Sequence, residues 1–157
     1  MKIISLVGSP HGKKGNTARL LNEVLKGAAS LGASNETIIL KGDTVLPCRG
    51  CDICHIKGKC AQKDEFNAIK QKICDADGLI LASPNYIFSV SAQLKAFMDR
   101  CCGVLHCMEF EGKYGASIVT SFRRTFPSFP SVTERLARAS SCPGHRAVTP
   151  SPLFRGR

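Results

Sequence analysis

Four cysteines lie close together in one short stretch of this 157-residue chain. Cys48, Cys51, Cys54 and Cys60 follow a C-x2-C-x2-C-x5-C spacing. Thiolates are soft ligands that select zinc, cuprous copper and iron–sulfur clusters, and a crowded run of cysteines is typical of a loop that encloses a compact cluster. Structural zinc more often lies between two separated pairs of ligands. The spacing favours a cluster, while zinc and a loop of free thiols or a redox disulfide stay open as alternatives.

His55 lies inside the cysteine run and is a further ligand candidate. Because four cysteines already suffice, we expect His55 to face solvent or to support a ligand. Other cysteines fall in segments with helical spacing, and we assign them no chemistry because free cysteine commonly fills cores as a small apolar residue. They are Cys74, Cys101, Cys102 and Cys107.

A glycine-rich polar segment, residues 8–17, follows the first apolar run at residues 2–7 and opens a helix. A helix N-terminus presents unpaired N–H groups and a partial positive charge to an anion. Ser9 and Thr17 add hydroxyls, Asn16 adds an amide, and the glycines allow close approach of the backbone. The segment matches neither the P-loop nor the dinucleotide motif. It predicts a phosphate site, and a plain strand-to-helix turn capped by Asn16 or Thr17 is the alternative.

A second unusual segment, residues 83–88, follows the apolar run at residues 78–82. Tyr86 and Phe88 offer flat apolar surface, and Pro84 stiffens the backbone. The segment could line an aromatic ring system, whereas core aromatics at a strand end are the alternative.

The surrounding pattern predicts an α/β fold. Apolar runs at residues 2–7, 37–40, 78–82 and 116–120 predict strands. Helices are predicted between them, with Asp64 as an N-cap. The apolar stripes that predict them contain Leu20, Leu21, Val24, Leu25, Ala28 and Leu31, then Phe66, Ile69 and Ile73, then Val90, Leu94, Phe97, Met98, Cys101 and Leu105. This alternation indicates a doubly wound parallel sheet in three layers, α/β/α. Ligands of such sheets bind where the strand order reverses, and both unusual segments follow the strands expected at that point.

The net charge of +10 is distributed unevenly along the chain. Residues 122–157 hold seven Arg, one Glu and no Lys, together with five of the eight prolines. A charge concentrated in this tail argues against a nucleic-acid surface on the body, although a small basic zinc-loop protein that binds nucleic acid stays as a rival interpretation. No apolar run reaches the length of a membrane span, and no signal peptide is recognised, so we expect a cytoplasmic protein without membrane or nucleic-acid partners.

Residues 122–157 therefore predict a separate, atypical segment after a body at residues 1–121. Proline is poorly tolerated inside helices and central strands, so we expect no fifth strand and no last helix there. The change from lysine to arginine indicates another reading frame, because codons for Phe-Arg-Arg-Thr read one base later can encode Ser-Gly-Gly.

Three segments taken together resemble the iron–sulfur flavoprotein family, a branch of the NADPH-dependent FMN reductase-like group with a flavodoxin-like fold. They are Gly8-Ser9-Pro10 with Gly15-Asn16-Thr17, residues 47–60, and residues 76–97. The resemblance implies FMN and one 4Fe-4S cluster. The phosphate would contact Ser9, His11, Gly15, Asn16 and Thr17. The isoalloxazine ring would contact Pro84, Asn85, Tyr86, Ile87 and Phe88. Cys48, Cys51, Cys54 and Cys60 would ligate the cluster.

The resemblance also implies an FMN-dependent oxidoreductase that takes electrons from a ferredoxin-like donor and assembles as a dimer or tetramer when the C-terminus is intact. A reductase of FMN or quinones that uses NAD(P)H without a cluster is the rival within the enzyme class. Three features depart from the family. His11 stands where relatives usually carry Arg, Phe88 stands where they often carry Gly, and Phe122-Arg123-Arg124-Thr125 replaces a glycine-rich loop.

Overall fold

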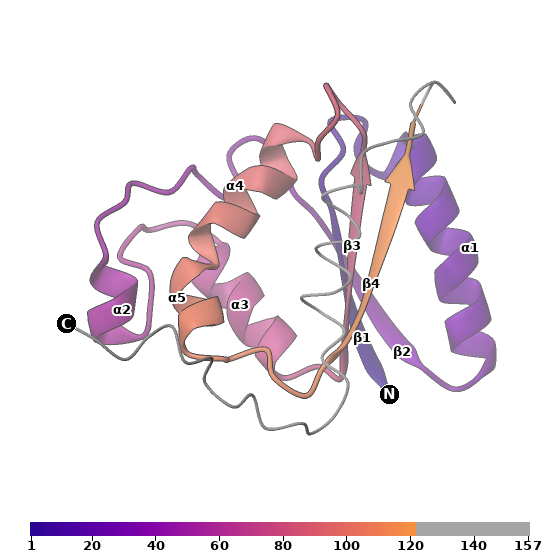
Figure 1. Ribbon diagram of the computed structural model, residues 1–157. Helices are drawn as coiled ribbons and strands as arrows, with labels where there is room; N and C mark the ends of the chain where they lie inside the picture. The colour runs from indigo at the N-terminus through magenta and orange to yellow at the C-terminus, as the bar shows by residue number, and fades with distance from the viewer. Residues whose placement is uncertain (122–157) are drawn as a thin grey trace, which may run out of the picture.

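Four parallel strands form the centre of the structure, a computed structural model that describes residues 1–121 (Figure 1). They are β1 (Lys2–Val7), β2 (Ser34–Ile39), β3 (Gly78–Pro84) and β4 (Tyr114–Thr120), in the spatial order β2-β1-β3-β4. In this register Leu6 of β1 lies opposite Ile38 of β2 and Leu81 of β3. The order reverses between β1 and β3, so the point where a ligand is expected lies between the two strands that precede the unusual segments.

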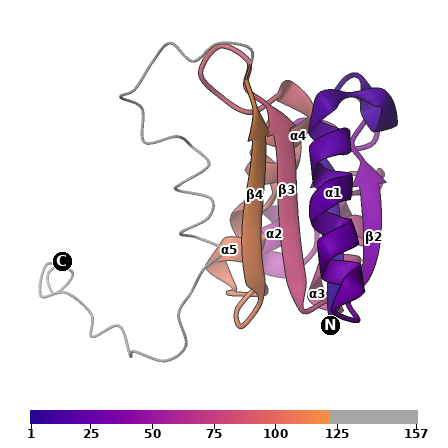
Figure 2. The same ribbon diagram turned by 90° about the vertical axis from the view of Figure 1, so that its right-hand side faces the viewer.

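Helices cover both faces of the sheet, which confirms the predicted three layers for residues 1–121. The helix α1 (Asn16–Ser30) lies on one face, while α3 (Phe66–Cys74), α4 (Ala92–Arg100) and α5 (Cys102–His106) lie on the other (Figures 1 and 2). A 3-10 turn, η1 (Gly12–Lys14), and the short helix α2 (Ile53–Lys57) complete the elements. The layers enclose two apolar clusters, one around Phe66, Leu94 and Phe97 and the other around Leu21 and Leu25.

Several expected boundaries were wrong. β2 begins at Ser34, before the apolar run, because an edge strand accommodates polar residues that point to solvent. The helix expected through Leu105 is broken at Cys101 into α4 and α5, and Leu105 is exposed. On α1, only part of the expected stripe is buried, because a helix on a sheet buries a limited arc of its circumference. Its exposed members are Leu20, Val24 and Leu31.

The expectations for residues 122–157 lie outside the described residues. Within residues 1–121, the structure has no helix with both the length and the apolar character of a membrane span.

Candidate functional site

The segment after β1 is bound tightly to the segment after β3. Gly8 N–H donates to the carbonyl of Ala82 at 2.8 Å, and the hydroxyl of Ser91 donates to the carbonyl of Gly8. A Cβ placed on Gly8 would lie 2.5 Å from Cβ of Leu94 and 2.8 Å from Oγ of Ser91. Glycine is therefore required at position 8, because α4 begins directly against the backbone there.

Ser9, His11 and Gly15 form a compact turn around η1. Ser9 is buried, and its hydroxyl accepts a hydrogen bond from the backbone N–H of His11 at 3.3 Å. A Cβ on Gly15 would lie 3.0 Å from Cβ of His11 and 3.1 Å from Oγ of Ser9. The structure thus brings these three predicted phosphate residues together, with the His11 side chain exposed.

The N-terminus of α1 begins at this turn. Gly15 occupies the N-cap position, no side chain caps the helix, and no acidic residue stands in its first turn. The alternative that Asn16 or Thr17 caps the helix was therefore wrong. Asn16 is exposed, while Thr17 is buried with its hydroxyl 2.6 Å from that of Thr120 at the end of β4. Within residues 1–121, neither a side-chain cap nor an acidic residue of the first turn offsets the positive end of the helix dipole, as an anion site requires.

The segment after β3 forms a tight turn with an exposed apolar surface. Tyr86 and Ser89 exchange two backbone hydrogen bonds, of 2.9 and 3.0 Å. Ile87 and Phe88, between them, have positive φ angles of 47° and 62°. Such angles favour glycine and are unusual for a β-branched residue, so the turn holds two side chains in a costly backbone conformation. The side chains of Tyr86, Ile87 and Phe88 are exposed, which excludes the alternative of core aromatics.

Pro84 and Asn85 connect this turn to the sheet. Pro84 is the last residue of β3, and Asn85 N–H donates to the carbonyl of Thr120 at 2.8 Å. The carboxyl ends of β1, β3 and β4 are therefore linked by hydrogen bonds into one edge of the sheet. An uncapped helix N-terminus and an exposed apolar turn share that edge. The first suits a phosphate group and the second suits an aromatic ring, so the edge fits a ligand that carries both.

The cysteine run lies apart from this edge, on the side of the sheet that α3, α4 and α5 cover (Figure 1). Cys48 and Cys51 are exposed, whereas Cys54 and Cys60 are partly buried. Cys54 lies on α2 against α5, where a Cβ on Gly103 would be 3.1 Å from its Sγ. Among residues 1–121, no group of three or more Cys, His, Asp or Glu side chains is arranged to hold a metal ion.

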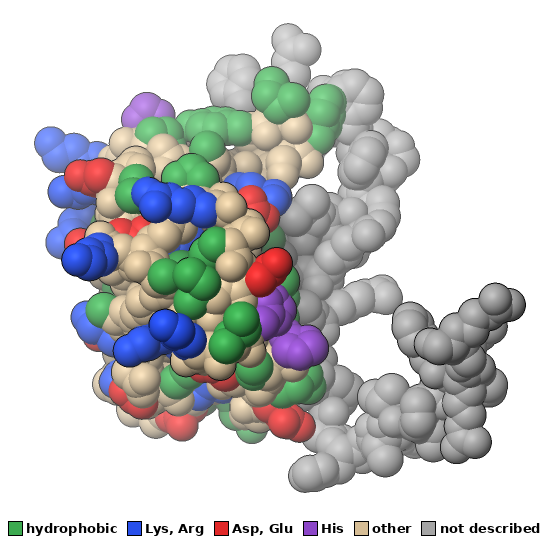
Figure 3. Space-filling view, turned by 90° about the vertical axis from the view of Figure 1, so that its left-hand side faces the viewer, with side chains coloured by type: hydrophobic (Ala, Val, Ile, Leu, Met, Phe, Trp, Pro, Cys, Tyr) green, Lys and Arg blue, Asp and Glu red, His purple; other side chains and the backbone are tan. Residues whose placement is uncertain are grey.

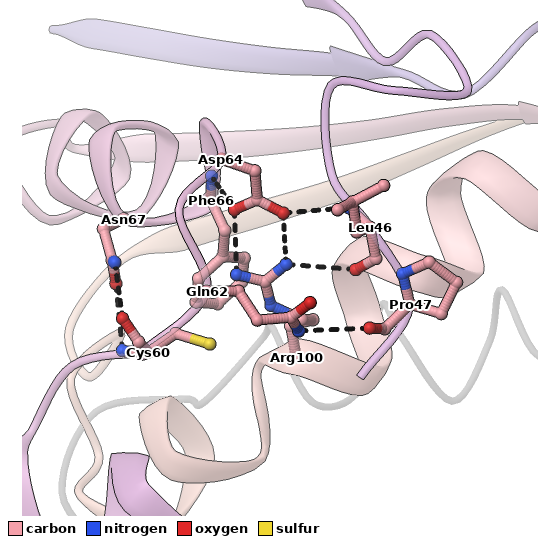
Figure 4. A network of polar contacts seen from close by, with 8 residues as sticks. All are labelled: Leu46, Pro47, Cys60, Gln62, Asp64, Phe66, Asn67 and Arg100. Carbon is pink, nitrogen blue, oxygen red and sulfur yellow. Dashed lines mark hydrogen bonds and ion pairs between the residues drawn. The ribbon is translucent and has the colours of Figure 1, made fainter. Parts of the chain in front are cut away.

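The two ends of the cysteine run are nevertheless fixed by a network of polar contacts around the buried pair of Asp64 and Arg100 (Figure 4). Leu46 N–H donates to Asp64 at 2.9 Å, and the carbonyl of Leu46 accepts from Arg100 at 3.0 Å. Gln62 donates to the carbonyl of Pro47 at 3.1 Å. The side-chain amide of Asn67 binds both backbone groups of Cys60, at 3.0 and 2.8 Å.

A bidentate ion pair between Asp64 and Arg100 lies at the centre of that network. Their side chains are 4% and 0% exposed. Burial by itself would raise the pKa of Asp64, but the hydrogen bond from Arg100 and those from the backbone of Leu46 and Phe66 lower it below its ordinary value. Burial likewise opposes the charge of Arg100, while Asp64 and then Cys60 raise the pKa of Arg100. Both groups are therefore held in their charged forms.

Two buried polar atoms in this network have no hydrogen-bond partner among residues 1–121. They are Nε of Arg100 and Oε1 of Gln62. An unpaired buried donor costs about 1–3 kcal/mol, so Nε–H of Arg100 requires an acceptor. A thiolate or sulfide can accept from it, whereas Oε1 of Gln62 is itself an acceptor. The soft thiol donors and the N–H of Arg100 fit an iron–sulfur cluster, although the thiols themselves are spread apart.

Sequence reasoning missed the network. Asp64 was expected as an N-cap, and it does accept the N–H of Phe66 at 3.1 Å, but Glu65 occupies the N-cap position and the main partner of Asp64 is Arg100. Arg100 had been given no role. A signal was present, because Arg100 follows Phe97 by three residues on the apolar stripe of α4, where a charged side chain requires a buried partner.

The remaining cysteines are held in different environments. Burial raises the pKa of the Cys101 thiol to about 12, which makes it an inert core residue as expected. Cys102 is exposed, with its Sγ 3.6 Å from Nε2 of His55. The rings of His55 and His106 lie edge to face 5.1 Å apart, and Figure 3 shows two adjacent histidine side chains on this side of the molecule. His55 therefore contacts α5 residues.

Comparisons with known proteins agree with this geometry. The family model described as NADPH-dependent FMN reductase matches residues 1–125. An iron–sulfur flavoprotein of Archaeoglobus fulgidus is 38% identical over 76% of this chain and 54% of its own length. One of Methanocaldococcus jannaschii is 39% identical over 79% of this chain and 64% of its own length. The chain thus spans roughly half to two thirds of these relatives.

Solved structures show the same fold. A crystal structure of an NADH:FMN oxidoreductase in its apo form has a TM-score of 0.55 at 23% identity, covering 78% of this chain and 59% of that protein. A flavodoxin, WrbA-like protein from Agrobacterium tumefaciens has a TM-score of 0.56 at 16% identity, covering 88% and 70%. The flavodoxin-like fold is thereby confirmed, and the chain belongs to the NADPH-dependent FMN reductase family, in which it is similar to the iron–sulfur flavoproteins.

Proposed function

We propose that this chain is an FMN-dependent oxidoreductase that receives electrons through a 4Fe-4S cluster on residues 47–60. The observation that carries the proposal is the junction of an uncapped helix N-terminus and an exposed apolar turn at one edge of the sheet, between β1 and β3. When bound, the cluster would supply single-electron transfer and FMN would convert it to two-electron chemistry. The chain's own residues bind, orient and shield these groups.

The first segment would bind the FMN phosphate. Backbone N–H groups at the start of α1, the amide of Asn16 and the hydroxyls of Ser9 and Thr17 would donate to it. No arginine stands at position 11, so the helix dipole and neutral donors carry most of the phosphate binding. The link from Thr17 to Thr120 fixes the start of the helix against the sheet.

The second segment would bind the isoalloxazine ring. The exposed side chains of Tyr86, Ile87 and Phe88 would cover its apolar surface, and the backbone of Pro84 and Asn85 would meet its polar edge. The two hydrogen bonds between Tyr86 and Ser89 hold this turn in shape before the ring is bound.

The cysteine run would bind the cluster through Cys48, Cys51, Cys54 and Cys60. Its ends are fixed by Asp64, Arg100, Gln62 and Asn67, while its middle projects outward with Cys51 exposed. The four thiols would gather only as the cluster is assembled, because binding a metal group and ordering its ligands are coupled.

A reductase of FMN or quinones that takes hydride from NAD(P)H, with zinc or no metal on the cysteines, is the second candidate. One observation favours it, namely that residues 1–121 contain no preassembled set of metal ligands. The two candidates share the flavin site and differ in the cysteine run and in the electron donor.

The electron donor and the assembly belong to the proposal as well. We propose a ferredoxin-like donor for the cluster form, NAD(P)H for the alternative, and a dimer or tetramer as the assembly of a chain with an intact C-terminus. A boundary near Ser121 between a flavin domain and an atypical tail is also proposed. The coding DNA after the Ser121 codon tests the tail: an alternative frame should encode a glycine-rich loop, an apolar strand and a helix.

A visible spectrum of anaerobically purified protein tests the cofactors. Flavin bands with a broad iron–sulfur shoulder are expected, and flavin bands alone with NAD(P)H oxidation would select the second candidate. Replacing Asn16 and Thr17 by Ala should weaken FMN binding at least tenfold in a fluorescence titration. Asn22→Ala, the same residue type further along α1, is the matched control and should leave FMN binding unchanged. Equal FMN affinity in both variants would refute the phosphate site.

A further inference from the structure

Among residues 1–121, Arg100 is the only charged residue that is buried as a whole. Its side chain is 0% exposed and its guanidinium stacks over the ring of Phe66 at 4.6 Å. A guanidinium has five N–H groups in a fixed planar arrangement, and burial leaves each of them dependent on a protein or ligand acceptor.

The terminal nitrogens of Arg100 are well satisfied. One donates to Asp64 and to the carbonyl of Leu46 at 3.0 Å, and the other donates to the second oxygen of Asp64 at 2.9 Å. Nε has no acceptor among residues 1–121. Because the bidentate pair fixes the plane of the group, Nε–H cannot turn to find a partner elsewhere.

Cys60 lies close enough to Arg100 to raise the pKa of the guanidinium, after Asp64. Figure 4 shows its thiol pointing from the end of the cysteine run toward the guanidinium of Arg100. The backbone of Cys60 is fixed at both N–H and C=O by Asn67. The thiol of Cys60 is therefore held facing a buried charge whose position Asp64 fixes.

We propose that Nε–H of Arg100 donates a hydrogen bond to the sulfur of Cys60 when a cluster is bound. This hydrogen bond would raise the reduction potential of the cluster. This inference rests on the proposed function. A hydrogen bond to a ligand sulfur, and a nearby positive charge, stabilise the more negative reduced form and raise the potential. Asp64 acts as a positioning residue, because it orients the guanidinium and leaves Nε as the free donor.

Gln62 provides the competing acceptor. Its Oε1 is the other unpaired atom of the network, and a hydrogen bond from Arg100 to it would satisfy both groups without any cluster. The choice of acceptor can be tested, because a hydrogen bond from Arg100 to Cys60 changes the reduction potential of the cluster, whereas one to Gln62 does not.

The test is a redox titration of the reconstituted protein, followed by electron paramagnetic resonance. Arg100→Lys keeps the charge and removes Nε–H. It should retain about four irons per chain and lower the potential by about 59 mV or more, a tenfold change in the one-electron equilibrium. Lys95→Met, which removes an exposed charge of α4, should leave the potential unchanged.

An unchanged potential in fully loaded Arg100→Lys protein would overturn the inference alone. Wild-type protein that takes up no iron would overturn the proposed cluster and this inference together. Should Arg100→Lys fail to fold, wild-type protein labelled with 15N-arginine replaces it. Pulsed resonance of the reduced cluster should then show coupling to an arginine nitrogen, and its absence would count against the hydrogen bond.

Discussion

Two regions are built in opposite ways: the proposed flavin edge, which is formed by the carboxyl ends of β1, β3 and β4, and the cysteine run. At the proposed flavin edge, the backbone is fixed by hydrogen bonds between strands, as between Gly8 and Ala82 or Asn85 and Thr120. In the cysteine run the ends are fixed through Asp64 and Arg100, and α2 packs against α5, while Cys48 and Cys51 lie exposed between these contacts. One region is preformed on the sheet, whereas the other has fixed points with exposed thiols between them.

This difference predicts how much of the chain would become ordered when each cofactor binds. A preformed site binds its ligand with little ordering of the chain, so FMN affinity should depend on a few contacts. The exposed thiols of the cysteine run must still be gathered around a cluster, and part of the free energy of cluster binding would be used to order them. Changes in one region should therefore leave the other largely intact.

Loss of one cysteine should have the largest effect. Cys51→Ala should abolish the cluster completely in an iron and sulfide assay, while FMN binding stays within about twofold, because the flavin edge does not depend on the loop. Cys74→Ala is the matched control, since Cys74 ends α3 and is not a proposed ligand. Parallel loss of iron in both variants would show that the run does not bind the cluster.

The second largest effect should come from breaking the ion pair of Asp64 and Arg100 at the ends of the cysteine run. Asp64→Asn leaves Arg100 buried without its carboxylate and should lower the free energy of unfolding by about 3–5 kcal/mol at pH 7, measured by urea denaturation. Asp99→Asn, from an exposed pair with Lys95, should cost about 0.5 kcal/mol or less.

The effect of Asp64 should depend on pH in a defined direction. Because the folded-state pKa of Asp64 is lowered, its stabilisation is present above the unfolded pKa of about 3.9 and is lost as pH falls through the folded value. The difference between wild type and Asp64→Asn should therefore narrow below about pH 4. A difference that stays constant down to pH 2 would contradict the assignment.

A change at the flavin edge should have a smaller effect on stability. Gly8→Ala places a Cβ 2.5 Å from Leu94, so it should destabilise the protein by about 1–3 kcal/mol and weaken FMN binding. Gly27→Ala on α1, where no atom lies within 4 Å of the added carbon, should instead stabilise by about 0.5–1 kcal/mol. Similar stabilities for the two variants would show that the edge is not tightly built.

The smallest effect should come from a change in the turn at residues 86–89, which is proposed to cover the isoalloxazine ring. Phe88 has a φ of 62°, which glycine adopts without the cost of about 1–2 kcal/mol that other residues incur. Phe88→Gly should therefore be about 1 kcal/mol more stable than Phe88→Ala, which removes the same ring but keeps Cβ. Equal unfolding free energies for the two variants would refute the strain at this position.

The sequence predicted the order of elements with few errors, while the flavin-binding role of the segments after β1 and β3 stays a prediction. Apolar runs such as residues 78–82 indicate buried strands, because alternation with helices leaves few ways to cover a parallel sheet. The expected position of both segments beside β1 and β3 was confirmed by the strand order. The same patterns failed at element ends, as in the break at Cys101, because local propensity there competes with packing.

The cysteine spacing and the residue types proposed to bind the phosphate follow from the sequence itself, since ligand chemistry depends on residue type. The sequence did not show which groups pair with the buried charges. Asp64 and Arg100 are 36 residues apart, and only the packing of α4 against the start of α3 makes them a pair. The unpaired Nε of Arg100 beside Cys60, and the positive φ of Ile87 and Phe88, were likewise decided by tertiary structure, because they depend on what surrounds each group rather than on its neighbours in sequence.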